Sequence, residues 1–280
     1  MAISPELAQK NEALAAELRS SGRTLVAYSG GADSAFLAWA AHQALGTDML
    51  AVIADSPSLA RFQLEDAKSF ASEQRIPLEI IQTQELSRPE YARNDAGRCF
   101  HCKDELFSVM EKFAAAQDFQ TIAYGVNLDD KSDFRPGQVA ARQHKVAAPL
   151  LDARLGKEEI RMLARNAGLR IWDKPASACL SSRIEYGRAV TPEALRAVER
   201  GEDALRALGF RQFRVRHHGD IARIEIAREE MDRALTPEMA AEFTRTFKGL
   251  GFKFVTLDLE GFRSGSMNVL LAAEQIVRAS

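Results

Sequence analysis

The chain has 280 residues, 46% of them hydrophobic and 27% charged, which is typical of a globular protein of about two domains with a sizeable core. Its 37 basic and 39 acidic side chains leave a net charge of −2, which argues against a protein whose main task is to coat nucleic acid. No apolar run approaches the roughly 18 residues that span a bilayer, and the polar, helical first residues do not resemble a signal peptide. We therefore expect a cytoplasmic protein without a membrane partner.

The first half of the sequence alternates short apolar runs with longer amphipathic stretches, which is typical of a parallel sheet wound by helices. The expected strands are 24–29, 49–54, 78–82 and 121–125, and the expected helices are 33–45, 58–74, 98–116 and 157–167. We expect Ser58 to cap the helix that it begins. This pattern predicts a doubly wound, Rossmann-like α/β domain over residues 1–172.

Beyond Pro175 the pattern changes to helix, two strands, helix and strand. The expected helices are 192–208 and 237–248, and the expected strands are 212–217, 221–226 and 253–259. Apolar and charged residues alternate along the first two strands, which indicates a hairpin with one solvated face. These elements predict a smaller C-terminal α+β domain over residues 173–280.

A glycine-rich loop, residues 29–34 (SGGADS), lies between the first expected strand and helix. Open α/β sheets bind ligands at this edge, and adjacent glycines let the backbone approach an anion. Amides at the start of the helix, together with its dipole, hold phosphate. The hydroxyls of Ser29 and Ser34 add donors. The Walker pattern is absent, and a structural turn with Asp33 as a cap explains the same residues on spacing alone.

The SGGxDS pattern after the first strand resembles the pyrophosphate loop of the ATP pyrophosphatases (PP-loop proteins), which cleave ATP to AMP and pyrophosphate and activate a substrate as its adenylate. The resemblance implies that adenosine lies near the ends of the second and fourth strands, at Ala54 and Gly125. Asp129 or Asp130 would then reach a magnesium ion, although a solvated loop explains these two acids equally well. The loop residues that the resemblance assigns to the nucleotide are Ser29, Gly30, Gly31, Asp33 and Ser34.

Three cysteines are present, of which Cys99 and Cys102 form a CxxC pair and Cys179 stands alone. A helix start with Arg98 and Lys103 nearby favours thiolates at the pair. Thioredoxin-like redox chemistry, a zinc site completed by Cys179 and a histidine, an iron–sulfur cluster held by three thiolates, and unrelated free thiols all remain open at this point.

Residues 172–187 (WDKPASACLSSRIEYG) closely resemble the KPxxACLxSRxxYG signature of the LarE-type sulfur transferases, which make the nickel-pincer nucleotide of lactate racemase. GVNLDD, FRVRHHGDIARIE and GFRSGSMN elsewhere extend the resemblance from about residue 10 to residue 270. In that family ATP adenylylates a carboxylate of a pyridinium dicarboxylate mononucleotide, and sulfur displaces AMP to give a thiocarboxylate. The catalytic residues that we expect from this resemblance are Asp33, Cys179, Ser182 and Arg183.

The resemblance also bears on the source of sulfur. Some members convert the cysteine matching Cys179 to dehydroalanine as a sacrificial donor, and these members lack the CxxC pair. This chain instead resembles the three-cysteine members, which implies that Cys99, Cys102 and Cys179 hold a [4Fe–4S] cluster whose open iron binds an extra sulfide. Sacrificial donation by Cys179 remains the alternative.

Arg214 and Arg216 lie two residues apart on one expected strand, hence on one face, where they can hold the phosphate of the mononucleotide. Arg263 precedes a loop of small residues suited to an anion, and Lys103 completes the expected nucleotide-binding residues. A solvated basic strand face is the alternative interpretation. We expect a small-molecule nucleotide substrate, no nucleic acid, and a homo-oligomer.

Proteins of other classes remain as alternatives. Some tRNA thiolases combine a pyrophosphate loop with three cysteines, but they need a broad basic face that this composition does not indicate. A non-enzymatic nucleotide-binding module with structural zinc would contain zinc and release no pyrophosphate. An amidotransferase ligase would share the loop but gives no reason for Cys179.

Overall fold

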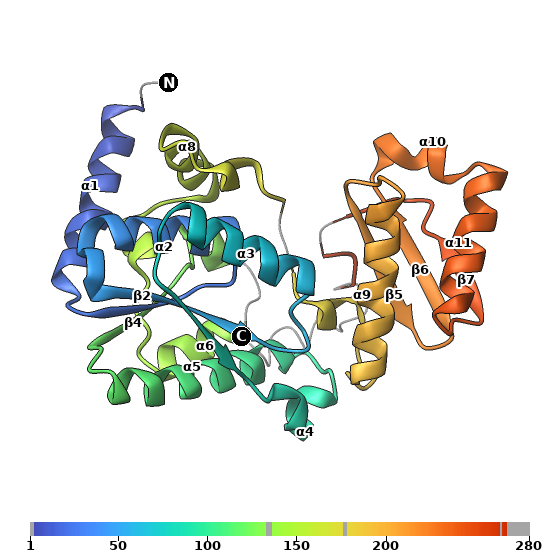
Figure 1. Cartoon of the computed structure of the whole chain (residues 1–280), viewed down its shortest axis with the longest axis horizontal. Coiled ribbons are helices and arrows are strands. Elements are labelled where there is room, and N and C mark those ends of the chain that lie inside the picture. Colours follow the sequence, from blue (N-terminus) through green and yellow to red (C-terminus); the bar gives the residue numbers. More distant parts are fainter. Residues whose placement is uncertain (1–2, 133–135, 176–177, 264, 268–280) are drawn as a thin grey trace. The chain divides into compact units, whose positions relative to one another are not determined.

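The computed structural model describes residues 3–132, 136–175, 178–263 and 265–267 (Figure 1). The chain forms two compact units. The first takes in the residues up to Glu85 and from Cys99 to Ser177, and the second is formed by Leu86–Arg98 and the residues from Ala178 onward. The sequence suggests one boundary, near residue 172. In the structure the chain also enters the second unit earlier, at Leu86, and returns to the first unit at Cys99. Within the described ranges, no helix is both long and apolar enough to cross a membrane.

The first unit contains a parallel four-stranded sheet in the order β3-β2-β1-β4. Its strands are β1 (Thr24–Ala27), β2 (Met49–Asp55), β3 (Leu78–Gln82) and β4 (Thr121–Tyr124). Thr24 of β1 pairs with Met49 on one side and with Thr121 on the other. The chain winds outward from β1 to β3 and then returns to place β4 beside β1. The strand order therefore reverses at β1, and such a reversal opens a crevice at the carboxyl ends of the strands.

Helices cover both faces of this sheet (Figure 1). Successive residues of a strand point to opposite faces, so Val26 packs with one group of helices and Leu25 with the other. One face is covered by α1 (Pro5–Ser20), α2 (Ala32–Leu45), α3 (Arg61–Glu73) and α8 (Lys157–Asn166), and the other by α5 (Arg98–Ala116) and α6 (Pro136–Gln143). The short helices α4 (Pro89–Ala92) and α7 (Pro149–Asp152) lie in the connections. The predicted doubly wound α/β class is confirmed.

The expectation that Ser58 caps a helix is wrong. Helix α3 begins at Arg61, and its N-cap residue is Ala60. Ser58 instead belongs to a turn in which its N–H donates to the hydroxyl of Ser56 at 3.1 Å. The N–H of Leu59 donates to the carbonyl of Ser56 at 3.0 Å. Local hydrogen bonding by serine therefore stabilises a turn here and delays the helix.

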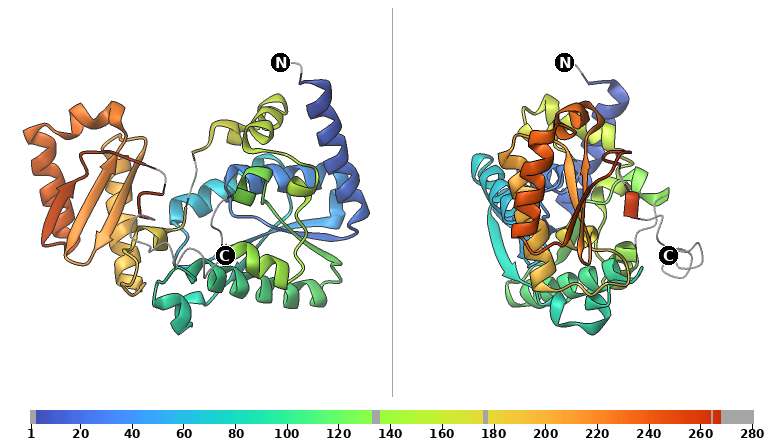
Figure 2. Two further views of the ribbon diagram at one scale, coloured as in Figure 1. Left: turned by 180° about the vertical axis from the view of Figure 1, so that it is seen from behind. Right: turned by 90° about the vertical axis from the view of Figure 1, so that its right-hand side faces the viewer.

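The second unit contains the three-stranded sheet β5-β6-β7, in which β5 and β6 are antiparallel and β6 and β7 are parallel. Its strands are β5 (Phe213–His218), β6 (Ile221–Ile226) and β7 (Phe254–Leu257), and its helices are α9 (Pro192–Ala207), α10 (Met231–Ala234) and α11 (Pro237–Gly249). Val215, Ile224 and Phe247 are fully buried in the core that the helices form with one face of the sheet. The opposite face carries charged side chains and is crossed by the segment after β7 (Figure 2). The predicted smaller α+β arrangement thus follows the alternation of apolar and charged residues along the strands.

A histidine clasp joins α5 to the segment after α6. The two ring nitrogens of His144 lie 3.0 Å from carboxylate oxygens of Asp104 and Glu111. Both nitrogens must carry protons to donate to both carboxylates, so the clasp selects the charged imidazolium. Burial alone lowers the pKa of His144, but the hydrogen bonds and charges of Asp104 and Glu111 outweigh it and raise the pKa above 6.5.

We predict that the clasp stabilises the fold more at low pH than at high pH. Because the folded-state pKa is raised, its contribution is fully present below about pH 6.5 and is lost as the pH rises through the folded-state pKa. His144→Gln should therefore cost about 0.5–1 kcal/mol at pH 6 and less at pH 8.5. Urea unfolding at the two pH values measures this difference. An equal loss at both would show that the ring acts only through packing against Phe107.

Candidate functional site

The predicted phosphate-binding loop joins β1 to α2 in the first unit. Gly30 has a φ of +74°, a left-handed conformation that glycine adopts without strain. A Cβ at this position would lie 2.8 Å from the Cβ of Ala67 in α3, so a side chain does not fit. The hydroxyls of Ser29 and Ser34 lie 3.0 Å apart, and Gly31, as the N-cap residue, gives α2 no side-chain cap. The loop therefore presents hydroxyl and amide donors at a helix N-terminus, which suits an anion.

The ends of β2 and β4 flank this loop, because both strands are neighbours of β1 in a parallel sheet. Gly125 directly follows β4 and approaches α2 so closely that a Cβ would lie 2.8 Å from both N and Cα of Ser34. Ala54 lies in β2, one residue before its end at Asp55. Ala54, Gly125 and the loop thus lie at one edge of the sheet, at the position where the strand order reverses.

A polar cluster lies beside the loop. The Asp33 carboxylate accepts a hydrogen bond from the side-chain amide of Asn127 at 3.0 Å. The buried Asp130 accepts one from the main-chain N–H of Asn127 at 3.4 Å and pairs with Lys157 at 3.0 Å. Burial raises the pKa of Asp33 and the charge of Asp130 raises it further, while Asn127, Lys157 and Arg161 partly offset this rise. Two neighbouring carboxylates beside a phosphate site suit Mg²⁺, which is commonly bound by one or two carboxylates together with substrate phosphates.

Asp129 has a different environment from Asp130. Its Oδ2 accepts a hydrogen bond from the N–H of Lys157, the first residue of α8, at 2.6 Å. A negative charge at a helix N-terminus is stabilised by the exposed amides and the helix dipole. Asp129 therefore caps α8, and Asp130 is the acid whose charge acts on Asp33.

The three cysteines form no disulfide with one another and are distributed over both units. Cys99 is exposed and Cys102 half-buried, and both lie at the beginning of α5. Cys179 is half-buried and precedes the 3₁₀ helix η5 (Leu180–Arg183) in the second unit. Within the described residues, no group of three His, Cys, Asp or Glu side chains is placed to hold a metal ion.

The side chain of Arg183 holds the backbone around Cys179. Arg183 is 1% exposed, and its Nε donates to Oε1 of Glu202 at 2.9 Å. Its Nη1 donates to the carbonyls of Ala178 at 2.7 Å and Cys179 at 2.9 Å. The hydroxyl of Ser182 donates to the same Cys179 carbonyl at 2.7 Å. Arg183 and Ser182, both predicted as catalytic residues, thus contact the main chain of Cys179, another of the four predicted catalytic residues.

The segment 86–98 is attached to the same loop. The hydroxyl oxygen of Tyr91 lies 2.5 Å from that of Ser181 in a buried contact. Arg98 is 3% exposed and donates from Nη1 to the carbonyl of Ser181 at 2.9 Å. Arg98 directly precedes Cys99 in the chain, and Ser181 follows Cys179 by two residues. Both contacts lie within the second unit and hold the segment 86–98 against the loop that follows Cys179.

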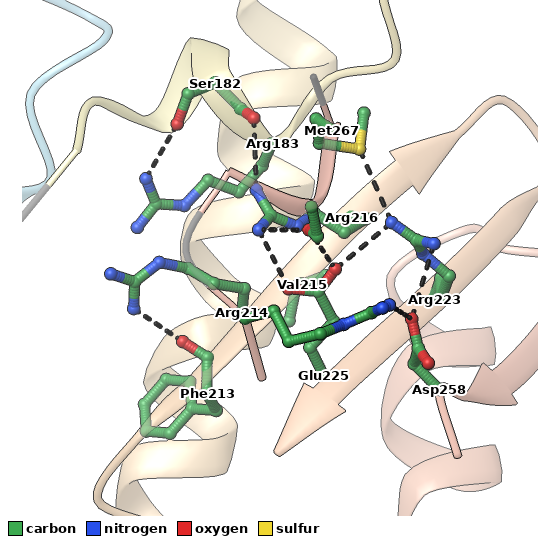
Figure 3. Close-up of polar contacts among 12 residues, drawn as sticks. Ser182, Arg183, Phe213, Arg214, Val215, Arg216, Arg223, Glu225, Asp258 and Met267 are labelled. Carbon is green, nitrogen blue, oxygen red and sulfur yellow. Dashed lines mark hydrogen bonds and ion pairs between the residues drawn. The ribbon is translucent and has the colours of Figure 1, made fainter. Parts of the chain in front are cut away.

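Arg216 lies at the centre of a charged network on the second sheet (Figure 3). Its Nη2 contacts Oε2 of Glu225 at 2.8 Å and the hydroxyl of Ser266 at 3.0 Å. Its Nη1 donates to the carbonyl of Ser182 at 3.2 Å. Arg216 is 6% exposed and Glu225 is fully buried, so this cation is already neutralised within the fold.

Arg214 lies beside Arg216 in a different electrostatic environment. It donates to the carbonyl of Phe213 at 2.6 Å, and its guanidinium lies 4.9 Å from the ring centre of Phe262. Burial, followed by the positive charges of Arg183 and Arg216, lowers the pKa of Arg214 to about 10, although neighbouring glutamates act in the opposite direction. An added anion would relieve this accumulation of positive charge.

The remaining predicted nucleotide-binding residues are Arg263 and Lys103. Arg263 is half-exposed and pairs with Glu260 at 2.7 Å and with Asp258 at 3.7 Å. Lys103 lies on α5 in the first unit, with its Nζ 5.9 Å from the ring centre of Phe107.

Sequence reasoning missed the acids that pair with the arginines. Glu202 lies four residues after Val198 and three before Leu205, within the buried stripe of α9. A glutamate in an apolar helical stripe requires a buried cation, and this signal predicts a partner such as Arg183. The pairing of Lys157 with Asp130 had no comparable signal, because both residues lie in polar sequence.

No protein-family model matches this sequence. A curated relative from Lactiplantibacillus plantarum, named pyridinium-3,5-bisthiocarboxylic acid mononucleotide synthase, is 35% identical over 271 residues, which cover 96% of this chain and 98% of the relative. An uncharacterized protein from Synechocystis is 42% identical over 249 residues, which cover 89% and 93%. One chain of the glutamine-hydrolyzing GMP synthase of Methanococcus maripaludis is 30% identical over 164 residues, covering 52% of this chain and 50% of its own.

Proposed function

Since the chain belongs to the family of LarE-type sulfur transferases, we propose that it thiolates a carboxylate of a pyridinium dicarboxylate mononucleotide at the expense of ATP. The similarity to a GMP synthase supports the assignment of ATP pyrophosphatase chemistry to the first unit. The substrate class rests on the name of the Lactiplantibacillus relative.

The proposed reaction has two steps. A substrate carboxylate oxygen attacks the α-phosphorus of ATP, pyrophosphate leaves, and an acyl adenylate forms. Sulfide then attacks the acyl carbon, the C–O bond to AMP breaks, and the products are a thiocarboxylate, AMP and a proton. Activation is needed because a carboxylate is a poor electrophile and oxide a poor leaving group, whereas AMP leaves readily.

The observation that carries this proposal is the edge of the first sheet where the phosphate loop, Gly125 and the Asp33 cluster meet. The loop amides and the hydroxyls of Ser29 and Ser34 bind pyrophosphate, whose negative charge develops as the α–β bond breaks. Asp33 and Asp130 would hold Mg²⁺, which would supply positive charge to neutralise the phosphates. Gly125, where a side chain would collide with Ser34 of α2, lies at the end of β4, where we place the adenosine.

We assign the phosphate of the mononucleotide to the arginine face of the second unit, with Arg214 as its main ligand. Arg214→Gln should raise KM for the mononucleotide about tenfold or more, because a charge-assisted hydrogen bond is lost, and leave KM for ATP unchanged within about twofold. Steady-state release of AMP measures both constants. Arg196→Gln, at an exposed arginine on α9 of the same unit, is the control. An unchanged KM in the Arg214 variant would show that this face is only a structural strand surface.

Replacing Arg216 would test binding of the mononucleotide phosphate less directly. Its removal leaves Glu225, which is fully buried, without its closest cation. Such a change destabilises proteins even where no ligand binds. Arg214, which is not part of this buried pair, reports on substrate binding more directly.

For the delivery of sulfur, we propose a [4Fe–4S] cluster held by Cys99, Cys102 and Cys179. Thiolates are the usual ligands of such clusters, and the donor set fits this group with one iron left open. The hydrogen bond from Arg98 to Ser181 supports the proposal, because these two residues neighbour the cysteines in sequence. When bound, the cluster would supply an iron that carries the sulfide to be transferred.

The proposed function is tested with protein purified without oxygen and supplied with ATP, Mg²⁺, sulfide and pyridinium-3,5-dicarboxylic acid mononucleotide. We expect AMP and pyrophosphate in equal amounts, together with a product in which sulfur replaces oxygen, detected by mass spectrometry. A protein that consumes ATP only when tRNA is added, or that releases AMP without forming a thiocarboxylate, would contradict the proposal.

A further inference from the structure

Lys174 reaches the phosphate loop from the end of the first unit. Its Nζ lies 2.7 Å from the carbonyl oxygen of Gly30 and also pairs with the carboxylate of Asp66 in α3. The Lys174 side chain is 15% exposed and that of Asp66 20% exposed, so water shields this pair only partly. The second oxygen of Asp66 pairs with Arg170 at 2.6 Å.

The peptide between Gly30 and Gly31 has little intrinsic preference for its orientation. Glycine populates positive and negative φ about equally, so a peptide between two glycines can rotate at small cost. The peptide is planar and trans, and its C=O and N–H therefore point in opposite directions. Fixing the Gly30 carbonyl toward Lys174 thus directs the N–H of Gly31 away from Lys174. In the structure the N–H of Gly31 donates a long hydrogen bond of 3.4 Å to the hydroxyl of Ser29, so it points toward the side of the loop that carries this hydroxyl.

The structure assigns to Lys174 the role of a positioning residue that orients this peptide, so that the N–H of Gly31 is available to pyrophosphate. The role depends on the ATP chemistry of the proposed function and adds a residue to it. The ammonium group also polarises the Gly30 carbonyl, which strengthens the opposite N–H as a donor.

The backbone of Lys174 is itself held in place. Nη1 of Arg161 donates to the carbonyl of Trp172 at 2.9 Å, and Nη2 donates to the carbonyl of Lys174 at 2.7 Å. Pro175 restricts the residue before it to an extended conformation, and Lys174 has a ψ of 126°. The backbone of Lys174 is therefore held in place, and only its side chain extends to the phosphate loop.

Three variants test this role. Lys174→Met removes the positive charge and roughly keeps the length of the side chain, and Lys174→Arg keeps a cation at this position. Arg170→Met removes the other cation that pairs with Asp66 and leaves the contact with Gly30 in place. Isothermal titration with magnesium pyrophosphate and, separately, with AMP measures the two halves of the nucleotide site. Thermal unfolding of each variant reports on the fold.

We expect Lys174→Met to weaken pyrophosphate binding about tenfold or more and AMP binding less than about twofold. Lys174→Arg should recover most of the pyrophosphate affinity, and Arg170→Met should bind it like the parent. Unchanged pyrophosphate affinity in Lys174→Met would overturn the inference. An equal loss in Arg170→Met would also overturn it, since the effect would then belong to the Asp66 anchor. A parent protein that binds neither pyrophosphate nor ATP would instead contradict the proposed function.

Discussion

Replacing Asp33 by asparagine should reduce pyrophosphate release by about a hundredfold or more and leave the protein folded. The carboxylate lies in the first turn of α2, beside the phosphate loop, and Asn127 holds one of its oxygens. Asparagine keeps the shape of the side chain but removes the charge that, together with that of Asp130, would attract Mg²⁺ under the proposed function. Release of pyrophosphate in the presence of Mg²⁺ and substrate is the measurement.

The stability of the same variant distinguishes a functional carboxylate from a structural one. Burial and the neighbouring charge of Asp130 raise the pKa of Asp33, so its charged form is less favourable in the folded protein than in the unfolded chain. Asp33→Asn should therefore unfold at the same temperature as the parent or higher at pH 7. Asp48→Asn, at an exposed carboxylate of the same unit, is the control. Full pyrophosphate release by the Asp33 variant would exclude this loop from the reaction.

Much of the first unit could be predicted because its signals are local. Apolar runs followed by amphipathic stretches gave the four strands, and the glycine-rich loop lies between β1 and α2 as expected. The membership of segment 86–98 in the second unit could not be predicted in this way. It depends on contacts such as Tyr91 with Ser181, which are separated by 90 positions in the sequence. No periodicity encodes which distant loop a short segment will contact.

The pairing of charges in the candidate site was harder to predict than the location of the charged residues on one strand face. Two arginines on one strand face predict an anion site only if no acid neutralises them. The structure pairs Arg216 with Glu225 on the neighbouring strand β6, whereas burial, followed by the positive charges of Arg183 and Arg216, lowers the pKa of Arg214. Both glutamates of this network are buried, and their burial is set by how α9 and β6 pack. Sequence spacing thus identifies the face, whereas packing decides which acids lie beside each of its arginines.

Replacing the cysteines should have the second large effect, which is a loss of iron and of sulfur transfer. The two interpretations of the sulfur source predict different results for these variants. If Cys99, Cys102 and Cys179 hold one cluster, protein made without oxygen should contain about four irons per chain. Replacing any of the three by serine should then remove the iron and sulfur transfer together, since two thiolates hold such a cluster poorly. The neighbouring His101→Ala variant should keep its iron, whereas a zinc site completed by that histidine would lose its metal.

Sacrificial donation predicts that only Cys179→Ser is inactive, and that the spent protein is lighter by the mass of hydrogen sulfide. Mass spectrometry of Cys179 after turnover therefore decides between the two. Dehydroalanine at this position, together with active Cys99→Ser and Cys102→Ser variants, would contradict the cluster. We expect an intact Cys179 and repeated turnover. A donor consumed in each reaction has no use for the CxxC pair, whereas a cluster needs it. Arg98, the residue directly before Cys99, donates a hydrogen bond to Ser181 in the loop that follows Cys179.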